Sequence, residues 1–134
     1  MAAVAFQKGL GAVHGLSEPI GAVHNTQHGL TNAVLLPYIL RANRKAVEPK
    51  FEHVSRHLGL SGAAGNGFDE TLRWVEELAA SLQIPTTLRA IGVDESTAVE
   101  LGIKAEANPT GHTNPIRYTA AEYEAIFRRA VDGQ

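Results

Sequence analysis

The sequence predicts an all-α fold, on the strength of three observations. Apolar side chains recur at helical spacing over most of the chain, Pro and Gly residues separate the helical segments, and no stretch alternates in the manner of a β-strand. A chain of 134 residues is long enough to bury a core as one compact unit. We therefore expect a single helical domain that spans residues 1–134.

The first two helices are expected on either side of a turn. Residues 2–16 are Ala-rich with apolar side chains at helical spacing, so they predict a buried helix that stops near Pro19. Asn25 and Thr26 are turn formers whose side chains can cap a new helix. That second helix is expected over residues 27–43.

Proline and glycine residues divide the middle of the chain. Pro37 predicts a kink in the second helix, because proline lacks the backbone N–H. Residues 48–58 predict a separate, short amphipathic helix with Pro49 in its first turn and Gly59 as its stop. The small and turn-forming residues of the segment 60–67 predict an exposed loop, which is the best internal hinge candidate.

The second half of the chain predicts three further helices joined by short connections. Each helix has apolar side chains three and four residues apart, and the last two begin at side chains that can cap a helix, Asp94 and Thr119. Glu122, three residues after Thr119, completes a capping box. The expected elements are helices at 68–83, 94–107 and 119–131, a helical turn at 86–91 and a loop at 108–115.

Charge and composition exclude several classes of protein. Twelve Lys and Arg against fourteen Asp and Glu give a net charge of −2, far from the basic surface that neutralises nucleic-acid phosphates. No apolar run approaches the ~18 residues of a membrane-spanning helix, and the N-terminus lacks the pattern of a secretory signal. We therefore expect a cytoplasmic protein that binds neither nucleic acid nor a membrane. Because the chain has no Cys, any metal must be held by His and carboxylate side chains.

Two of the six histidines are candidate metal ligands. His14 lies near the end of the first expected helix and His28 at the start of the second, so the turn between them can bring both imidazoles together. Neutral imidazole is a good ligand for Fe, Zn or Ni. The separation of fourteen residues is not a local metal-binding spacing, and the alternative is that the two histidines cap a helix or pack in the core.

The other histidines and the Gly-rich run are weaker indications of a functional site. His53 and His57 share one helix face, but Val54 follows His53 where a zinc protease motif needs Glu, so both are expected to be solvated. His24 and His112 are expected at the surface or at the rim of a site. The run GLGAVHG has no strand before it, so it is not a nucleotide-binding loop, and its small residues are expected to permit close helix packing.

Two motifs lie between Gly9 and Asn43. The first, GLGAVHG, ends a helix with His14, and the second, HGLTNAVLLP, opens a helix with His28. Together they resemble the C-terminal helical domain of the iron-containing (group III) alcohol dehydrogenases, in the dehydroquinate synthase-like superfamily. Two later segments are also similar to that family. The first is Ile84-Pro85 followed by Leu88 to Gly92, and the second is Asn114-Pro115 followed by Arg117. The resemblance spans nearly the whole chain.

The resemblance implies a metal site that this chain only half supplies. In the family, four side chains hold the metal: an Asp and a His of an Asp-x-x-x-His stretch, followed by two further His. His14 and His28 fall on the latter two, and no Asp precedes Asp69. The implied ion is Fe(II), and two imidazoles suit Zn or Ni as well. Glu18 stands where many relatives have another His, and a carboxylate there could act catalytically by relaying a proton.

The resemblance also implies an oxidoreductase that transfers hydride between an alcohol and NAD(P), with the metal as a Lewis acid. The family's N-terminal α/β domain, which carries the Gly-rich NAD(P) loop, is missing from this sequence. We therefore expect little or no dehydrogenase activity from this chain alone, and NAD(P) binding only when a separate chain supplies that domain. The alternative is a non-catalytic helical module, derived from the family, that acts as a binding or scaffold protein.

Self-association is a further expectation. Without the helices that carry the other ligands, the apolar faces of the helices at 2–16 and 30–40 should be exposed. Exposed apolar patches of this kind drive dimerisation. We therefore expect a homo-oligomer, a dimer or larger.

Overall fold

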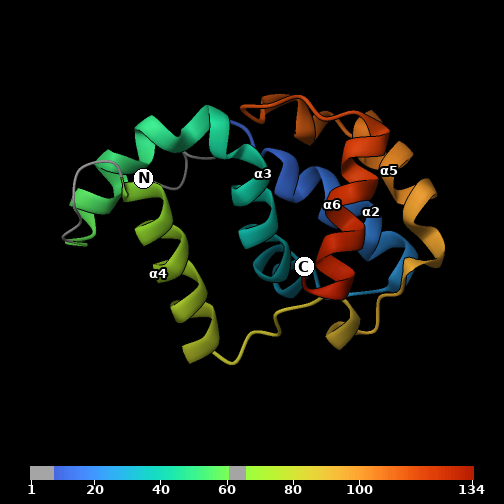
Figure 1. The fold of residues 1–134 in the computed structure, drawn as a ribbon. Helices are drawn as coiled ribbons and strands as arrows, with labels where there is room; N and C mark the ends of the chain where they lie inside the picture. The colour runs from blue at the N-terminus through green and yellow to red at the C-terminus, as the bar shows by residue number, and fades with distance from the viewer. Residues whose placement is uncertain (1–7, 61–65) are drawn as a thin grey trace.

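The computed structural model describes residues 8–60 and 66–134, and the regular secondary structure within these ranges is all helical (Figure 1). The predicted all-α class is confirmed, and the described residues contain no strand. The α-helices are α2 (Ala12–His24), α3 (His28–His57), α4 (Gly67–Ser81), α5 (Ala98–Ala107) and α6 (Ala120–Asp132). Short 3-10 helices connect them, and these are η1 (Arg89–Ile91), η2 (Glu95–Thr97) and η3 (Pro109–Thr113).

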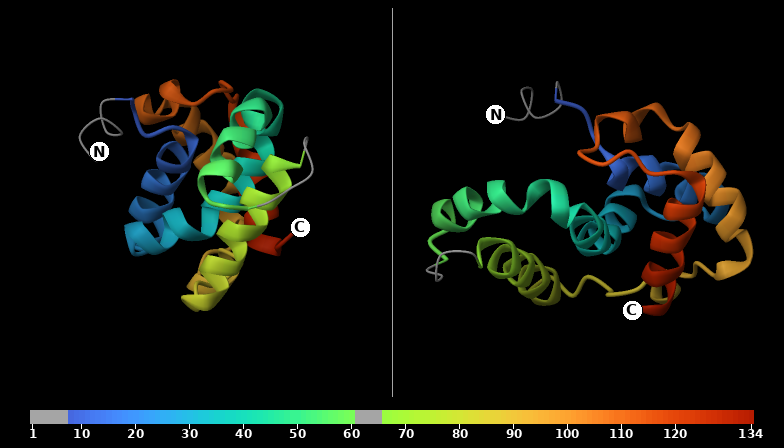
Figure 2. Two further views of the ribbon diagram at one scale, coloured as in Figure 1. Left: turned by 90° about the vertical axis from the view of Figure 1, so that its left-hand side faces the viewer. Right: turned by 45° about the horizontal axis from the view of Figure 1, so that its top comes forward.

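The helices form a main body and an arm (Figure 2). In the main body, α2, the first half of α3, α5 and α6 pack around one apolar cluster, with Leu16, Leu35 and Phe127 among its fully buried side chains. In the arm, α4 packs against the second half of α3 around a smaller cluster that contains Phe68 and Leu72. The candidate histidines belong to the main body.

Helix α2 begins later and ends later than predicted. It starts at Ala12 and continues through Pro19 to His24, while residues 2–7 of the predicted helix lie outside the described part of the chain. A proline inside a helix costs about 3 kcal/mol. Leu16 and Ile20 are 0% exposed, and burying two such side chains contributes roughly 1.5–3 kcal/mol each. Burial of the helix face therefore outweighs the proline.

The turn residues between α2 and α3 act differently from the prediction. Asn25 ends α2 in the left-handed conformation, with φ 53° and ψ 41°. The cap of α3 is Gln27, whose side-chain oxygen accepts a hydrogen bond from the amide of Leu30. Asn is one of the few residues that adopts this conformation at low cost, so it suits a helix end as well as a helix start.

The two helices predicted at 27–43 and 48–58 form one continuous helix of 30 residues. Pro37 and Pro49 both lie inside it, and Figure 1 shows α3 changing direction along its length. Proline removes one backbone hydrogen bond but permits the helical backbone, so a bent helix continues where its faces are buried on both sides of the bend. The predicted boundary at Pro49 is therefore wrong.

The predicted stop of that helix at Gly59 is confirmed. Gly59 has φ 69°, and the amide of Leu60 donates to the carbonyl of Ser55 over 3.0 Å, as in the common left-handed helix end. The predicted loop at 60–67 falls largely on residues 61–65, which lie outside the described residues. At its end, Gly67 already begins α4, where an added Cβ would meet the backbone of Glu52 at 2.7 Å.

The later elements follow the predictions closely, except that Pro109–Thr113, within the loop expected at 108–115, forms the 3-10 helix η3. Helix α4 matches the helix expected at 68–83, and Arg89–Ile91 forms the short helical turn. Asp94 caps the segment that leads into α5, and Thr119 caps α6 in a capping box with Glu122. Hydrogen bonds from the backbone and side chain of Thr119 hold the pKa of the Glu122 carboxyl below its ordinary value.

Side chains from a distant loop complete the start of α2. Gly11 has no side chain with which to cap the helix, so the free amides of the first turn need other partners. The amide of Gly11 donates to Oγ1 of Thr113 and the amide of Ala12 to Oδ1 of Asn114, each over 3.2 Å. These partners lie 102 residues further along the chain, so the first turn of α2 depends on tertiary contacts.

Asn114 also ties this loop to the middle of α3. Its Nδ2 donates to Oδ1 of Asn43 over 2.7 Å, and Nδ2 of Asn43 donates back to Oδ1 of Asn114 over 3.0 Å. The hydroxyl of Tyr118 donates to the same Asn43 oxygen over 2.8 Å. Burial raises the pKa of Tyr118 to about 12, so this donor keeps its proton through the neutral range. The network joins α2, α3 and the segment before α6.

The exposed apolar surface differs from the prediction. Leu16, Val34 and Leu35 are buried within the chain, so the expectation of exposed apolar faces is wrong for the described parts of these helices; residues 2–7 lie outside the described residues. In the described ranges, no helix has the length and apolar character needed to cross a membrane. The large apolar side chains that remain exposed are Val54, Leu58, Trp74, Leu78, Leu82, Val99 and Ile103.

We predict that Asn114→Ala destabilises the chain strongly. The change removes a helix cap and leaves Asn43, only 5% exposed, without its amide partner, for a total cost of about 2–4 kcal/mol. Chemical denaturation followed by circular dichroism measures it. Asn66→Ala is the control, because Asn66 is exposed and makes no side-chain cap. Equal stability of the two variants would contradict the role given to Asn114.

Candidate metal centre

The structure brings the two candidate histidines together. His14 lies in the first turn of α2 and His28 is the first residue of α3. Their ring centroids are 5.0 Å apart, with an angle of 58° between the ring planes. His14 is half-buried and His28 is exposed, so the pair lies where α2 and α3 meet the surface.

A third side chain, Asn32, lies between the two imidazoles. It follows His28 by one turn of α3, and its Nδ2 lies 3.0 Å from Nε2 of His28 and 3.3 Å from Nε2 of His14. Both Nε2 atoms therefore lie within hydrogen-bond distance of the same amide group, so the two candidate ligand atoms converge on one point.

The donor set meets part of what a metal ion requires. Two neutral imidazoles with convergent Nε2 lone pairs suit a divalent transition metal such as Fe, Zn or Ni. Structural and catalytic sites use three or four protein ligands. In the part of the chain that the structure describes, no group of three or more His, Asp or Glu side chains is placed to hold an ion. The histidines therefore fit a metal as half of a site.

Glu18 lies one turn after His14 on α2, with its carboxylate directed to another partner. Its Oε2 accepts a hydrogen bond from Nδ2 of Asn108 over 2.8 Å, and the side chain is exposed. Asn108 follows the last residue of α5. The carboxylate thus links α2 to the end of α5, and it would have to exchange this partner to take part in proton transfer at the histidine pair.

The remaining histidines lie outside the candidate site. His53 and His57 are exposed on α3, where Nη2 of Arg56 donates to Nδ1 of His53 over 2.8 Å. His112 is exposed in η3. His24 is half-buried, and its Nε2 lies 2.7 Å from Oγ1 of Thr97, so it joins the end of α2 to the segment before α5.

A close approach of two backbones sets the position of α2. A Cβ added to Gly15 would lie 3.1 Å from the Cα of Gly111 in η3 and 3.2 Å from the hydroxyl of Tyr123. Gly15 follows His14 directly, so the same contact that seats α2 against η3 also seats the His14 backbone. The prediction that small residues in this run permit close packing is confirmed at Gly15.

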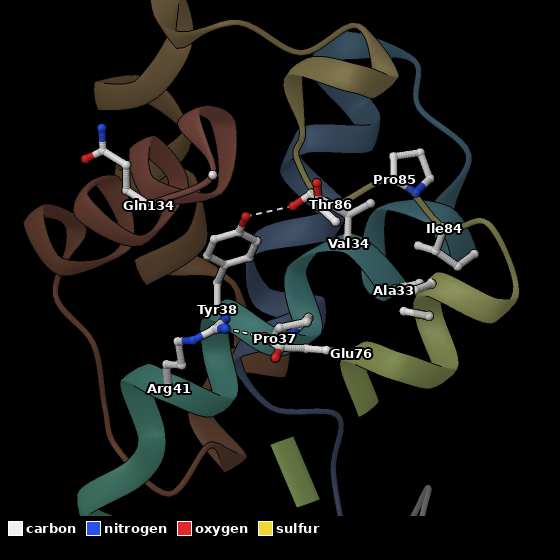
Figure 3. A pocket seen from close by; sticks show the side chains of 13 residues that line it. Ala33, Val34, Pro37, Tyr38, Arg41, Glu76, Ile84, Pro85, Thr86 and Gln134 are labelled. Carbon is white, nitrogen blue, oxygen red and sulfur yellow. Dashed lines mark hydrogen bonds and ion pairs between the residues drawn. The ribbon is translucent and has the colours of Figure 1, made fainter. Parts of the chain in front are cut away.

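A cavity of about 310 Å³ lies apart from the histidine pair, between α3, α4, the segment that follows α4 and the last two residues (Figure 3). The hydroxyl of Tyr38 donates to the carbonyl of Thr86 across it over 2.7 Å. An ion pair between Arg41 and Glu76 lies at its edge. Neither histidine lines this cavity, so it is separate from the candidate metal centre.

Comparison with known proteins identifies the family. The family model described as Fe-containing alcohol dehydrogenase family, C-terminal, matches residues 1–131. The chain therefore belongs to the Fe-containing alcohol dehydrogenase family and corresponds to its C-terminal domain.

Individual relatives also match this chain in sequence, each over only part of its own length. Lactaldehyde reductase of Escherichia coli (strain K12) is 31% identical over 126 residues, which cover 91% of this chain and 33% of that protein. NADPH-dependent butanol dehydrogenase of Clostridium saccharobutylicum is 33% identical over 133 residues, or 95% of this chain and 34% of that protein. The chain thus spans about a third of the length of these relatives.

Solved structures resemble the fold as well. 1,3-Propanediol oxidoreductase matches with a TM-score of 0.84 and 30% identity, over 90% of this chain and 32% of that chain. Maleylacetate reductase from Rhizobium sp. strain MTP-10005 matches with a TM-score of 0.69 and 28% identity, over 93% of this chain and 33% of that chain. The helical arrangement described above is therefore that of the family's C-terminal domain.

We predict that Gly15→Val displaces α2. The added side chain would overlap η3, and overpacking of this kind costs about 1–3 kcal/mol. Gly29→Ala is the matched control, since Gly29 adjoins His28 and an added Cβ would meet only the flexible side chain of Gln27. Thermal unfolding compares the variants. A Gly15→Val variant as stable as Gly29→Ala would show that the contact with Gly111 does not seat α2.

Proposed function

We propose that this chain supplies the His14–His28 half of the metal site of an NAD(P)-dependent alcohol dehydrogenase. The observation that supports this function best is the convergence of the two Nε2 atoms on the amide of Asn32, at 3.0 and 3.3 Å. Family membership supports the reaction type, because relatives carry names such as lactaldehyde reductase and NADPH-dependent butanol dehydrogenase.

The proposed chemistry assigns roles to three side chains. His14 and His28 bind the divalent ion and fix its position between α2 and α3. When bound, such an ion acts as a Lewis acid on an alcohol or carbonyl oxygen, which favours hydride transfer to or from the nicotinamide. Glu18, on the same helix as His14, is proposed to accept or return the alcohol proton, after releasing the amide of Asn108.

The proposed activity also depends on groups that the described residues do not supply. The described residues supply two donors, and four are expected for a metal held firmly in this family. The nucleotide-binding domain of the family has no counterpart among the elements that the structure describes. We therefore propose that turnover requires the part of the family that carries the NAD(P) loop and the Asp-x-x-x-His ligands, which a separate chain could supply, and that residues 1–134 alone have little or no dehydrogenase activity.

Metal titration tests the half-site. We expect one Fe(II) or Zn(II) per chain, or per dimer, in anaerobic calorimetry, because the two convergent imidazoles form a chelate. The parent for this experiment is a His53→Ala/His57→Ala variant, which removes the other close histidine pair. Adding His14→Ala and His28→Ala should abolish the binding. Unchanged binding after these two substitutions, or none in the parent, would refute the proposed site.

An activity assay separates the enzyme from its alternative. We expect no NAD(P)H oxidation with aldehyde substrates from the chain alone, and saturable activity when the N-terminal part of a family member is added. His14→Ala should remove the gain and His57→Ala should not. A stable, folded chain that gains no activity would favour the non-catalytic binding or scaffold module.

We also propose that the chain self-associates through α4. Trp74 and Leu78 on this helix and Leu82 directly after it are spaced by four residues and are 37%, 44% and 63% exposed, so they form an apolar stripe. Sedimentation velocity should show mass rising with concentration. Leu82→Glu should weaken the association, and Val99→Glu on α5 should not. A monomer mass that does not change with concentration would contradict this proposal.

A further inference from the structure

A second cavity, of about 320 Å³, lies where α5 ends, η3 follows and α6 begins. Its lining comes from all three parts of the chain. It includes Glu106 near the end of α5, Gly111 and His112 in η3, Arg117 just before α6 and Tyr123 in the first turn of α6. Neither candidate metal ligand lines it, so the histidine pair does not account for this cavity.

The hydroxyl of Tyr123 is an unused hydrogen-bond donor at this cavity. Tyr123 is 2% exposed. Its neighbour Tyr118 donates to Asn43, whereas the Tyr123 hydroxyl has no hydrogen-bond partner among the described residues. A Cβ added to Gly111 would lie 2.6 Å from this hydroxyl, so the hydroxyl stands beside another residue that lines the cavity. A buried hydroxyl is costly unless a ligand or a water accepts its proton.

Two opposite charges line the same cavity without pairing. The side chains of Arg117 and Glu106 are exposed, and neither takes part in an ion pair or a side-chain hydrogen bond within the described ranges, although other charged residues of α5 and α6 form ion pairs. Burial raises the pKa of Tyr123, so its hydroxyl keeps its proton beside them. A cavity with one charge of each sign complements a ligand that carries both.

We propose that this cavity binds a small zwitterion, a free α-amino acid. Arg117 and the hydroxyl of Tyr123 donate to its carboxylate, and Glu106 accepts from its ammonium group. The ring of His112 supplies a further donor for the carboxylate. This inference does not rest on metal binding, because neither His14 nor His28 lines the cavity.

The two helix ends favour the same orientation of the ligand. Anions are stabilised near a helix N-terminus and cations near a helix C-terminus. Helix α6 begins shortly after Arg117, and α5 ends directly after Glu106. The carboxylate of Glu122 also lies in the first turn of α6, but the amide and hydroxyl of Thr119 already donate to it. The start of α6 therefore suits the carboxylate of the ligand, and the end of α5 suits its ammonium group.

The size and the lining of the cavity limit the side chain of the ligand. A volume of about 320 Å³ is at the lower end of the range for ligand pockets, about 300–1,000 Å³. The aromatic rings of Tyr118 and Tyr123 supply apolar surface beside the charged groups. The cavity therefore suits an amino acid with a short apolar side chain, and L-alanine is the probe.

A comparison of L-alanine with lactate tests the zwitterion. The two molecules have nearly the same shape, and lactate has a hydroxyl where L-alanine has the ammonium group. We expect L-alanine to bind about tenfold more tightly, because a hydrogen bond between two charged groups is lost with lactate. Nuclear magnetic resonance titration measures both affinities, with a chelator present so that no metal ion at the histidine pair holds the ligand.

Two results of this titration would overturn the inference. One is lactate binding as tight as that of L-alanine, or no binding of L-alanine at all. The other concerns the position of the ligand. L-Alanine should shift the backbone signals of Gly111 and Tyr123, and shifts centred on His14 and His28 instead would place the ligand elsewhere.

Three substitutions test the assigned contacts. Glu106→Gln should weaken L-alanine binding about tenfold without weakening lactate binding, because only L-alanine has the ammonium group, whereas Arg117→Gln should weaken both about tenfold. Tyr123→Phe should also weaken both, and it should leave the Tm of the free chain unchanged because it removes an unpartnered hydroxyl. Arg73→Gln, at an exposed arginine of α4, is the matched control and should change neither affinity. An unchanged L-alanine affinity in any of the first three variants would overturn the proposed site.

Discussion

The hydrogen bonds of Asn114 hold together the parts of the chain on which the candidate metal centre depends. One side chain caps the first turn of α2, pairs with Asn43 in the middle of α3 and stands beside the loop that leads to α6. His14 lies in that first turn, and its place relative to His28 follows from how α2 meets α3. A partly buried amide pair suits this task, because its bonds are directional whereas apolar contacts alone permit sliding.

Two kinds of contact place the histidine pair. One joins residues that are close in the sequence, and the other joins residues that are far apart in it. His28 and Asn32 are neighbours on one helix face whatever the rest of the fold does. His14 reaches them only because α2 is seated against η3 at Gly15 and capped by Asn114. The proposed metal site thus depends on packing of the main body, which seats α2 against η3.

Prediction from sequence succeeded where local chemistry decides the structure and failed where burial does. The capping box of Thr119 and Glu122 and the stop at Gly59 were predicted at the correct residues, because each depends on a few neighbours. Pro19 and Pro49 were expected to bound helices and lie inside them. Their local cost is overcome by the buried faces that adjoin them, which a local pattern does not register.

The sequence by itself determined the helical segments, the absence of thiol chemistry and, through its two motifs, His14 and His28 as a candidate pair. Only the tertiary structure decided that Asn32 lies between their Nε2 atoms and that Thr113 and Asn114 complete the start of α2 from 102 residues away. The physical reason is the distance along the chain over which each interaction acts. Periodicity and capping act within a turn or two of helix, whereas a side chain contributed by a distant loop has no signature near the residue that it contacts.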